Sequence, residues 1–557
     1  MIRHGANAAA AVPPHRFARM SYDALIIGAG HNGLVAACYL ARAGLKVCVV
    51  EKNNWIGGAA VSRELYPGFT YSNCSYVSSL FRPEIMRDLE LSKHGLQILP
   101  YEGGAMFTES GGYLGMFRDH DANRREMARH SKRDAEAYDR YARDILRHCR
   151  FIRPLLMRRP PDPASFRPRD LAELAWLGKQ MFDLSEMAMY DMIRFWTMSI
   201  ADYLDEYFEN PVVKAYQAVG SIIGTALGPM SPGTAYVLLH HAMGDVDGNV
   251  GAWGYARGGM GSITKALAAS LRAAGGQIRA GVAVEQVLVR NGRAVGVALA
   301  NGDEIRASRV VSNMDVRRTF LRHVAEKELP GDFVKRVKAF KTRGSSGKLN
   351  IALDGLPRFT ALPEGAPNVK GDMHFTDSIE KMEAAYDDWK DGRFSREPFQ
   401  DVMIPTLIDP TMTPPGKHFM SCFVQYAPPK IEGRDWTDAD RDAFGRACLD
   451  QIERAAPGFK NLVLHVEVRT PRELEAEVGL TEGNIFQGEL TFDQLLFNRP
   501  VPGYADYRSP VRDLWICGSS THPGGGVMGA PGRNAAAEIL RDMKLPAKDM
   551  SDAYAVL

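Results

Sequence analysis

A glycine-rich turn between a short apolar strand and a helix constrains this chain more than any other feature. The turn, Gly28-Ala29-Gly30-His31-Asn32-Gly33, follows the apolar run 24–27 and precedes an apolar stretch over 34–43. In such a unit the first glycine permits the turn, the second lets a pyrophosphate approach the backbone, and the third lets the helix pack on the strand. A second strand over 46–50 ends at Glu51, whose carboxylate can accept hydrogen bonds from a ribose diol. Because all these parts occur in register, the segment predicts dinucleotide binding rather than a glycine turn alone.

Two further glycine-rich segments favour FAD among the dinucleotides. Gly57 and Gly58 closely follow Glu51, which suits a long cofactor whose diphosphate and flavin continue along the protein. Near the end of the chain, the apolar run 514–517 leads into Gly518-Ser519-Ser520-Thr521-His522-Pro523-Gly524-Gly525-Gly526 and a predicted helix over 534–543. The start of such a helix can stabilise negative charge at the pyrimidine end of a reduced flavin. A glycine-rich surface turn is the alternative, but the neighbouring residues are apolar.

These segments resemble those of the phytoene desaturase and carotenoid isomerase group of FAD enzymes, from about residue 22 to about residue 540. Gly258-Gly259-Met260-Gly261-Ser262 and Gly483-Asn484-Ile485-Phe486-Gln487-Gly488-Glu489 are similar to the subgroup named for a pyridine nucleotide-disulphide oxidoreductase domain. The resemblance implies FAD as cofactor and an α/β fold. It implies a Rossmann-like FAD-binding domain of the glutathione-reductase and amine-oxidase type, with an inserted α+β substrate domain. Gln487 departs from the pattern, in which histidine is more usual, and this weakens a proton-transfer role there.

The resemblance also assigns the cofactor contacts residue by residue. It implies that the ADP and diphosphate contact Gly28, Gly30, Gly33, Glu51, Lys52, Gly57, Gly58 and Ala59. It places Gly518, Val527 and Met528 near the ribityl chain and flavin ring, and the backbone of Val284 against the adenine. A core position in a strand would be compatible with that role of Val284.

Composition and cysteine spacing narrow the class of protein. The chain has 68 Lys and Arg against 66 Asp and Glu, so its charge gives no argument for nucleic-acid binding. Its seven cysteines form no CxxC pair, which argues against a zinc site and a dithiol redox centre, and no metal site is expected. The cysteines are expected to be reduced and buried, and no run of eighteen apolar residues predicts a transmembrane helix. The expected location is the cytoplasm, with peripheral contact to the inner membrane as a further expectation.

The sequence pattern predicts a discontinuous arrangement of domains. Residues 1–20 are basic and alanine-rich, and we expect a disordered arm; a transit-like peptide and a true start at Met20 are the alternatives. The FAD-binding domain is expected to comprise 20–104, 250–320 and 500–545. The substrate domain is expected to comprise 105–249, which is mostly helical and interpreted as a lid, and 321–499.

The segment after the second glycine-rich stretch predicts the strands that complete the FAD-binding domain. A helix is predicted over 263–274, strands over 294–299 and 304–307 with Asn301-Gly302 as a hairpin turn, and a short strand over 310–312. No second strand–GxGxxG–helix unit occurs, so a separate NAD(P)H domain is not predicted. We therefore expect electrons to pass from the flavin to oxygen or a quinone.

Two helical stretches bear on the substrate. Residues 140–157 place apolar side chains on one face and arginines away from it, as in helices that lie on anionic bilayers; a packed helix with a solvated arginine face is the alternative. Residues 171–200 are rich in methionine and aromatic side chains, which adapt to elongated apolar ligands but are equally explained by core packing. Together the two stretches favour a small lipophilic substrate delivered from, or near, a membrane.

Flavin chemistry requires few protein groups, so the catalytic candidates are those near the flavin loops. Thr521 and His522 lie in the C-terminal glycine-rich loop, and a histidine can act as acid or base near neutral pH. The alternative for His522 is that it holds the loop by hydrogen bonds. Tyr76 is a third candidate, because in related folds the segment that follows the first FAD segment reaches the flavin.

The sequence thus predicts an FAD-dependent oxidoreductase. We expect it to desaturate or dehydrogenate a lipophilic, polyene- or isoprenoid-like substrate by hydride transfer to flavin N5, with reoxidation by oxygen or a quinone. Three alternatives stay open: a flavin amine oxidase acting on a small amine, a flavin-dependent double-bond isomerase without net redox change, and a non-enzymatic flavoprotein that acts through partners. The sequence does not predict the oligomeric state.

Overall fold

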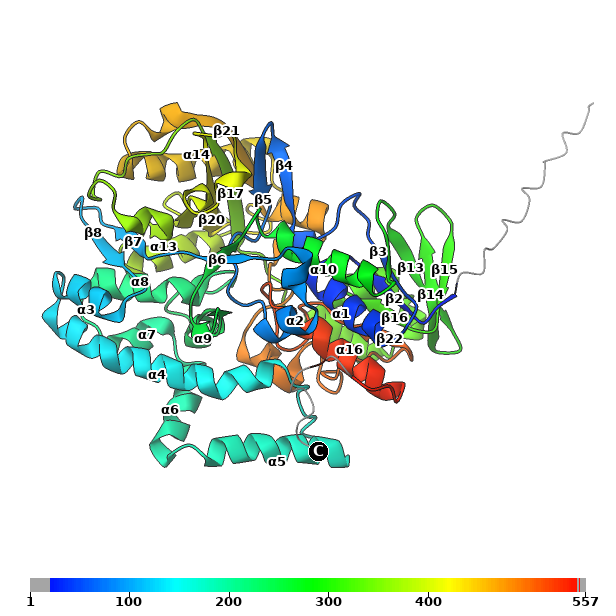
Figure 1. Ribbon diagram of the computed structural model, residues 1–557. Coiled ribbons are helices and arrows are strands. Elements are labelled where there is room, and N and C mark those ends of the chain that lie inside the picture. Colours follow the sequence, from blue (N-terminus) through cyan, green and yellow to red (C-terminus); the bar gives the residue numbers. More distant parts are fainter. Residues whose placement is uncertain (1–20, 548–549, 551–557) are drawn as a thin grey trace, which may run out of the picture.

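Two larger sheets organise the fold, which the computed structural model describes over residues 21–547 and at residue 550. The predicted arm over 1–20 lies outside the described residues. One sheet carries the glycine turn and lies to the right in Figure 1, whereas the other lies at the upper left above a group of helices.

The first sheet is parallel and has the strand order β12–β3–β2–β16–β22. Its strands are Gln277–Arg279 (β12), Val47–Val50 (β3), Ala24–Ile27 (β2), Val310–Ser312 (β16) and Leu514–Ile516 (β22). The four strands from β3 to β22 are buried along their whole length, as expected for a parallel sheet that is covered on both faces.

Helices cover one face of the parallel sheet and a smaller sheet covers the other. Helices α1 (His31–Arg42), α10 (Gly261–Ala273) and α16 (Ala530–Asp542) share a hydrophobic core with β2 and β3 (Figure 1). The smaller sheet has the order β1–β15–β14–β13. Its strands are Ser21–Tyr22 (β1), Glu304–Ala307 (β15), Arg293–Leu299 (β14) and Val284–Arg290 (β13). This arrangement confirms the predicted Rossmann-like α/β fold.

The predicted hairpin around Asn301-Gly302 is confirmed, since β14 and β15 flank it and Gly302 has a φ of +88°. The three predicted helices next to the glycine-rich segments are also present, but each begins two to four residues earlier than predicted. Helix α1 begins at His31, inside the glycine turn, because the turn itself supplies the first helical residues.

The second sheet has seven strands in the order β21–β17–β20–β19–β18–β7–β8. They are Val463–Arg469 (β21), Ser346–Leu353 (β17), His418–Gln425 (β20), Phe399–Met403 (β19), Asp372–His374 (β18), Gly104–Phe107 (β7) and Tyr113–Met116 (β8). Neighbouring strands are antiparallel except β18 and β7, which are parallel. Helix α14 (Asp438–Ala455) packs on this sheet through Phe444, Cys448 and Ile452.

A helical region connects the two sheets. Its main helices are α3 (His120–Ala128), α4 (Lys132–Leu156), α5 (Pro168–Phe182), α6 (Glu186–Thr197), α7 (Ile200–Asp205), α8 (Pro211–Ile222) and α9 (Thr234–Ala242). The predicted helical stretch 171–200 is divided between α5 and α6, because Ser185 caps a new helix by accepting a hydrogen bond from the backbone of Ala188. Helices α5 and α6 lie below α4, at the margin of the molecule in Figure 1.

The division into predicted domain segments stays a prediction, although the strands of each sheet come from matching segments. The parallel sheet draws its strands from 24–50, 277–312 and 514–516, and the seven-stranded sheet from 104–116 and 346–469. All seven cysteines are free and buried, and no cluster of potential metal ligands occurs within the described residues. Within the same residues, no helix combines the length and the apolar character that a bilayer span needs.

Candidate active site

The glycine turn between β2 and α1 has the geometry that a diphosphate requires. Gly28 has a φ of +94°, and a Cβ atom at Gly33 would lie 2.3 Å from the carbonyl oxygen of Gly28. A Cβ atom at Gly30 would lie 2.8 Å from Nδ2 of Asn313. No side chain caps the first turn of α1, so its backbone N–H groups can bind an anion. A side chain at Gly30 or Gly33 would therefore clash with Asn313 or with the turn itself, and the uncapped N–H groups of the first turn of α1 can face phosphate groups.

Glu51 is fixed at the end of β3 by two backbone N–H groups. Its Oε2 accepts a hydrogen bond from the N–H of Ala29 at 2.9 Å, and its Oε1 accepts one from Asn53 at 3.0 Å. Lys52, in contrast, has an exposed side chain, and its Nζ donates to the carbonyl oxygen of Ala476 at 3.0 Å. The structure thus holds Glu51 against the glycine turn and directs the Lys52 side chain to another segment; the ADP contact of Lys52 stays a prediction.

The second glycine pair approaches the same turn. The N–H of Gly57 donates to the carbonyl oxygen of Ala29 at 2.9 Å, and Gly30 and Gly57 form an isolated parallel bridge. Gly57 and Gly58 have φ values of +117° and +55°, a region that favours glycine. Ala59, which follows, lines a large cavity.

The C-terminal glycine-rich loop, which begins at Gly518, lies beside Asn313 and the large cavity. A Cβ atom at Gly518 would lie 2.8 Å from the carbonyl oxygen of Asn313. Val527 is half-buried and lines the large cavity, whereas Met528 is buried in a small apolar cluster with Leu80 and Ala530.

Val284 is buried at the start of β13, two residues after Val282, whose N–H donates to the carbonyl oxygen of Glu51 at 3.1 Å. The first residues of β13 are therefore next to the strand end that carries the predicted ribose-binding acid. Val284 is also a core residue of its sheet, so both roles weighed from the sequence are compatible with its position.

Buried polar atoms test whether these loops fit FAD. Nε2 of His31, Oδ1 of Asn32, Oγ of Ser75 and Oε1 of Gln487 are buried and have no hydrogen-bond partner within the described residues. Buried polar atoms in native proteins are normally paired, so a bound polar ligand would satisfy them. His31 and Ser75 also line the large cavity. The glycine cradle, the fixed acid and these unpaired atoms fit a flavin dinucleotide.

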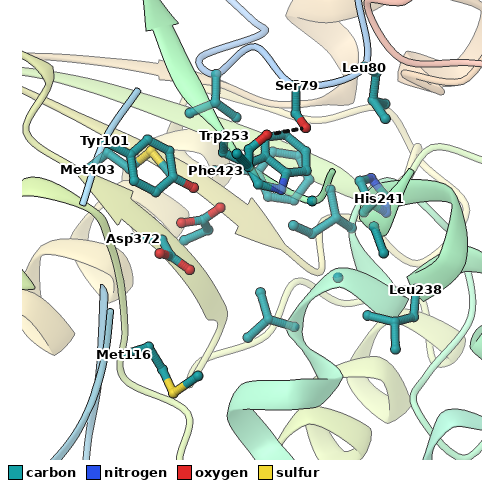
Figure 2. A pocket seen from close by; sticks show the side chains of 18 of the residues that line it. Ser79, Leu80, Tyr101, Met116, Leu238, His241, Trp253, Asp372, Met403 and Phe423 are labelled. Atoms are coloured by element: carbon teal, nitrogen blue, oxygen red, sulfur yellow. Dashed lines mark hydrogen bonds between the residues drawn. The ribbon is translucent and has the colours of Figure 1, made fainter. Parts of the chain in front are cut away.

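The large cavity has a volume of about 1160 Å³ and extends from these loops to the seven-stranded sheet and the helical region. Apolar side chains from α4, α8 and α9 line one part of it, including Ile145, Leu146, Val219 and Leu238, together with Ile223 directly after α8. Figure 2 shows Leu238, His241 and Leu80 on one side of the cavity, and Tyr101, Asp372 and Met116 on the other.

The second side contains an acidic cluster, which comprises Tyr76, Tyr101, Tyr216, Asp372, His374 and Asp401. The Tyr76 hydroxyl donates to Oδ2 of Asp401 at 2.5 Å. Nε2 of His374 lies 2.9 Å from Oδ2 of Asp372, and the Tyr216 hydroxyl lies 3.2 Å from the same oxygen. All of these residues except His374 line the cavity.

The His374 ring faces an acceptor at each nitrogen. Nδ1 lies 3.1 Å from the carbonyl oxygen of Gln400, and Nε2 faces the Asp372 carboxylate. A neutral ring could donate to only one of them, so the Asp372–His374 pair holds one extra proton. Burial alone would lower the pKa of His374, but the hydrogen bond of its ring to Asp372 and the nearby Asp401 together raise that pKa.

For Asp401, burial shifts the pKa in the direction opposite to its effect on His374. It raises the pKa of the Asp401 carboxyl to about 6; Asp372 acts in the same direction, whereas His374 opposes it. Oδ1 of Asp401 is buried and has no hydrogen-bond partner within the described part of the chain.

Lys348 adds a cation beside this cluster. It lies on β17, is 2 % exposed, and lines the cavity. Its Nζ donates to Oδ1 of Asn350 at 3.0 Å and to Oγ of Ser421, and lies 5.3 Å from the centre of the Tyr76 ring. Burial lowers its pKa to about 8.

The structure separates the three predicted catalytic residues. Tyr76 lines the cavity and stacks on Phe423, with ring centres 5.7 Å apart. Thr521 donates its hydroxyl to the carbonyl oxygen of Gly518 at 2.8 Å, and Nε2 of His522 bonds to the carbonyl oxygen of Leu155 at 2.8 Å. Neither Thr521 nor His522 is among the described residues that line the large cavity.

This geometry favours the alternative in which His522 holds the C-terminal loop by a hydrogen bond instead of acting as an acid or base. Burial lowers its pKa to about 4, so the ring is neutral near neutral pH and its hydrogen bond joins the C-terminal loop to α4. Sequence reasoning missed Asp372, His374, Asp401 and Lys348. One local signal was available, because Asp372 and His374 are two residues apart on a strand and so point to the same face.

Comparison with known proteins identifies the family to which this chain belongs. The model of the family described as flavin containing amine oxidoreductase matches residues 33–540. This chain belongs to that family. The match confirms FAD as the cofactor and an oxidoreductase as the class of enzyme, and it agrees with the glycine cradle and the fixed acid.

Three curated relatives span almost all of this chain. The mouse protein named pyridine nucleotide-disulfide oxidoreductase domain-containing protein 2 is 42% identical in an alignment of 553 positions that covers 94% of each chain. A limonene dehydrogenase component from Castellaniella defragrans is 26% identical and covers 94% of this chain and 95% of its own. The chloroplastic prolycopene isomerase of Daucus carota is also 26% identical and covers 91% of this chain and 78% of its own. These similarities confirm the resemblance to carotenoid-type enzymes.

A solved structure agrees on the fold. Cyclohexylamine oxidase from Brevibacterium oxydans has a TM-score of 0.54 to this protein at 16% identity, covering 94% of this chain and 99% of its own.

Proposed function

We propose that this protein is an FAD-dependent dehydrogenase or desaturase that acts on a lipophilic substrate. The observation that carries the proposal is the large cavity, because it joins the FAD loops at Ala59 and Val527 to an apolar wall from α4, α8 and α9. Such a wall binds elongated apolar molecules by removing their surface from water. The proposal also draws on relatives whose names refer to limonene and prolycopene, both of which are lipophilic.

The residues of the chain supply binding, shielding and proton transfer in this proposal. FAD, when bound, supplies a hydride acceptor and passes the electrons to oxygen or a quinone. The apolar wall orients the substrate and excludes water from the reacting carbon atoms. Dehydrogenation also removes a proton, and the acidic cluster offers an acceptor in the Asp401 carboxylate.

The test is an anaerobic reduction assay with the FAD-loaded protein. Limonene, squalene, cyclohexylamine and putrescine are added separately, and loss of the visible flavin absorption is followed. We expect an isoprenoid to bleach the flavin and to yield a product that lacks two hydrogen atoms. A product of unchanged mass would support the isomerase alternative, and bleaching by the amines alone would support the amine oxidase alternative; either result overturns the proposal.

One observation favours the amine oxidase as a second candidate. The acidic cluster places Asp372 and Asp401 in the cavity wall, and buried carboxylates are natural partners of a substrate ammonium group. The same assay decides between the two candidates.

A further inference from the structure

The acidic cluster is a built polar site inside a largely apolar cavity. Its tyrosines and carboxylates come from five separate parts of the chain: the segment after β5 (Phe69–Ser72), the loop before β7, helix α8, strand β18 and the adjacent strand β19. Asp401 is 4% exposed and keeps one carboxylate oxygen without a hydrogen-bond partner among the described residues. An unpaired buried carboxylate oxygen is costly, so the site lacks a hydrogen-bond donor that a ligand could supply.

Tyr101 supplies a hydrogen-bond donor, which complements the carboxylate acceptors. Its side chain is half-buried and lines the cavity, and its hydroxyl makes no hydrogen bond within the part of the chain that the structure describes. Figure 2 shows the Tyr101 ring on the same side of the cavity as Asp372. The site therefore offers acceptors on its carboxylates and, from the cavity wall, a free donor on Tyr101.

The charges at this site are already balanced. His374 shares the extra proton with Asp372, and Lys348 lies beside Tyr76, which is bonded to Asp401. Two carboxylates thus face two basic groups, so an additional ammonium group would leave an excess positive charge in a buried place. A neutral group that both donates and accepts a hydrogen bond fits better, and a hydroxyl is the simplest such group.

We propose that the acidic cluster binds the hydroxyl group of a lipophilic alcohol. The hydroxyl donates its single proton to the unpaired Oδ1 of Asp401 and accepts from Tyr101, while the hydrocarbon part lies along the apolar wall. This inference rests on the proposed function, because it assumes that the apolar wall holds the rest of the substrate.

The test compares three probes with the same linear chain: decanol, decyl methyl ether and decylamine. Each is titrated into the FAD-loaded full chain, and binding is followed by the shift of the visible flavin absorption and by the rise in melting temperature. The ether can only accept, and the amine carries a positive charge. We expect decanol to bind about tenfold more tightly than the ether, which corresponds to one net hydrogen bond.

Two variants assign this preference to the cluster. Tyr101→Phe removes only the free hydroxyl, and Asp401→Asn removes the carboxylate charge while keeping an acceptor for Tyr76. Each is expected to reduce the preference for decanol over the ether to less than about threefold. Tyr138→Phe is the matched control, because Tyr138 also lines the cavity but its hydroxyl pairs with Asn123. It should keep the full preference.

The outcomes separate this inference from the proposed function. Equal binding of decanol and the ether, tighter binding of decylamine, or an unchanged preference in Tyr101→Phe overturns the hydroxyl site but leaves a lipophilic substrate standing. Failure of all three decyl compounds to bind overturns the proposed function itself.

Discussion

Asp401 lowers the stability of the folded protein when its carboxyl ionises, although the residue forms part of the cavity wall. Its carboxyl is buried beside a second carboxyl, so ionisation costs more in the folded protein than in the unfolded chain. The folded protein therefore holds this proton more tightly, with a pKa of about 6 against about 4 for an unperturbed aspartate.

This difference predicts a pH-dependent effect of Asp401→Asn. A raised folded-state pKa contributes stability that is fully present below the unfolded pKa and is lost as the pH rises through the folded pKa. The variant cannot ionise, so its advantage over the parent should grow between about pH 4 and pH 6 to the order of 2 kcal/mol and then stay constant. Melting temperatures of both proteins at acidic and at slightly alkaline pH measure it. An equal difference at the two pH values would contradict the assigned ionisation.

The residues that the sequence could reveal are those whose partners are close along the chain. Gly28, Gly33 and Glu51 belong to one strand–turn–helix–strand unit, so their spacing alone predicts their shared role. Asp372 and Asp401 meet only because β18 pairs with β19, and Lys348 joins them through β17. Pairing of distant strands cannot be derived from local pattern, and neither can the contact that draws His522 to α4.

Single glycines decide how closely two elements approach each other. Gly33 lies where α1 passes over the end of β2, and a methyl group there would lie 2.3 Å from the Gly28 carbonyl oxygen. Gly178 lies in the middle of α5, and a methyl group there would meet nothing within 4 Å.

The two glycines therefore predict opposite outcomes for the same substitution. Gly33→Ala should displace α1 and abolish FAD retention, whereas Gly178→Ala should stabilise α5 by up to about 1 kcal/mol, because alanine favours helices. The ratio of flavin to protein absorption after gel filtration measures the first effect, and thermal unfolding measures the second. A fully loaded Gly33→Ala protein would show that the close approach of α1 is not needed.

At the scale of elements, the structure bears on which helices could carry the predicted membrane contact. Several arginines of the basic stretch are paired with acids: Arg147 with Asp144 at 3.0 Å, Arg153 with Asp245 at 2.7 Å, and Arg158 with Glu173 at 2.9 Å. The exposed apolar side chains lie instead on and beside α5 and α6, where Phe166 is 89% and Phe182 83% exposed. We therefore propose that peripheral membrane contact occurs through α5 and α6.

Vesicle flotation tests this proposal. Phe182→Asp combined with Met187→Asp should reduce the fraction that floats with neutral phosphatidylcholine vesicles several-fold, because burial of apolar area drives such binding. Charge reversal at Arg143, Arg147 and Arg150, measured with vesicles that also contain an anionic lipid, is the control and should change little. The opposite pattern would restore the arginine face as the membrane-binding element.

At the scale of the whole molecule, FAD binding and folding are linked. The cradle takes residues from the two ends of the described chain, from Gly28 to Val527, so it exists only in the folded protein. A ligand that binds only the folded state stabilises it by about 2.7 kcal/mol at one hundred times its Kd.

Removal of FAD should therefore lower the melting temperature of the whole chain by several degrees, and its return should restore it. Glu51→Ala should weaken FAD binding about tenfold or more and reduce the recovered shift, because the predicted ribose acceptor and the bonds to Ala29 and Asn53 are lost. Glu285→Ala, at an exposed position of β13, is the control. If the Glu51→Ala and parent proteins recover equal shifts, Glu51 does not bind the cofactor.

The strand order of the parallel sheet also has a consequence for biosynthesis. Strand β22 completes this sheet beside β16, and α16 then covers it, yet both come from residues after 513. While a ribosome is still translating the seven-stranded sheet, β16 has one edge without its partner and α1 lacks its neighbour α16. The five-stranded sheet therefore cannot be complete before the last tenth of the chain emerges. A premature stop codon before residue 514 would leave β16 without its partner β22 and one face of the sheet without α16.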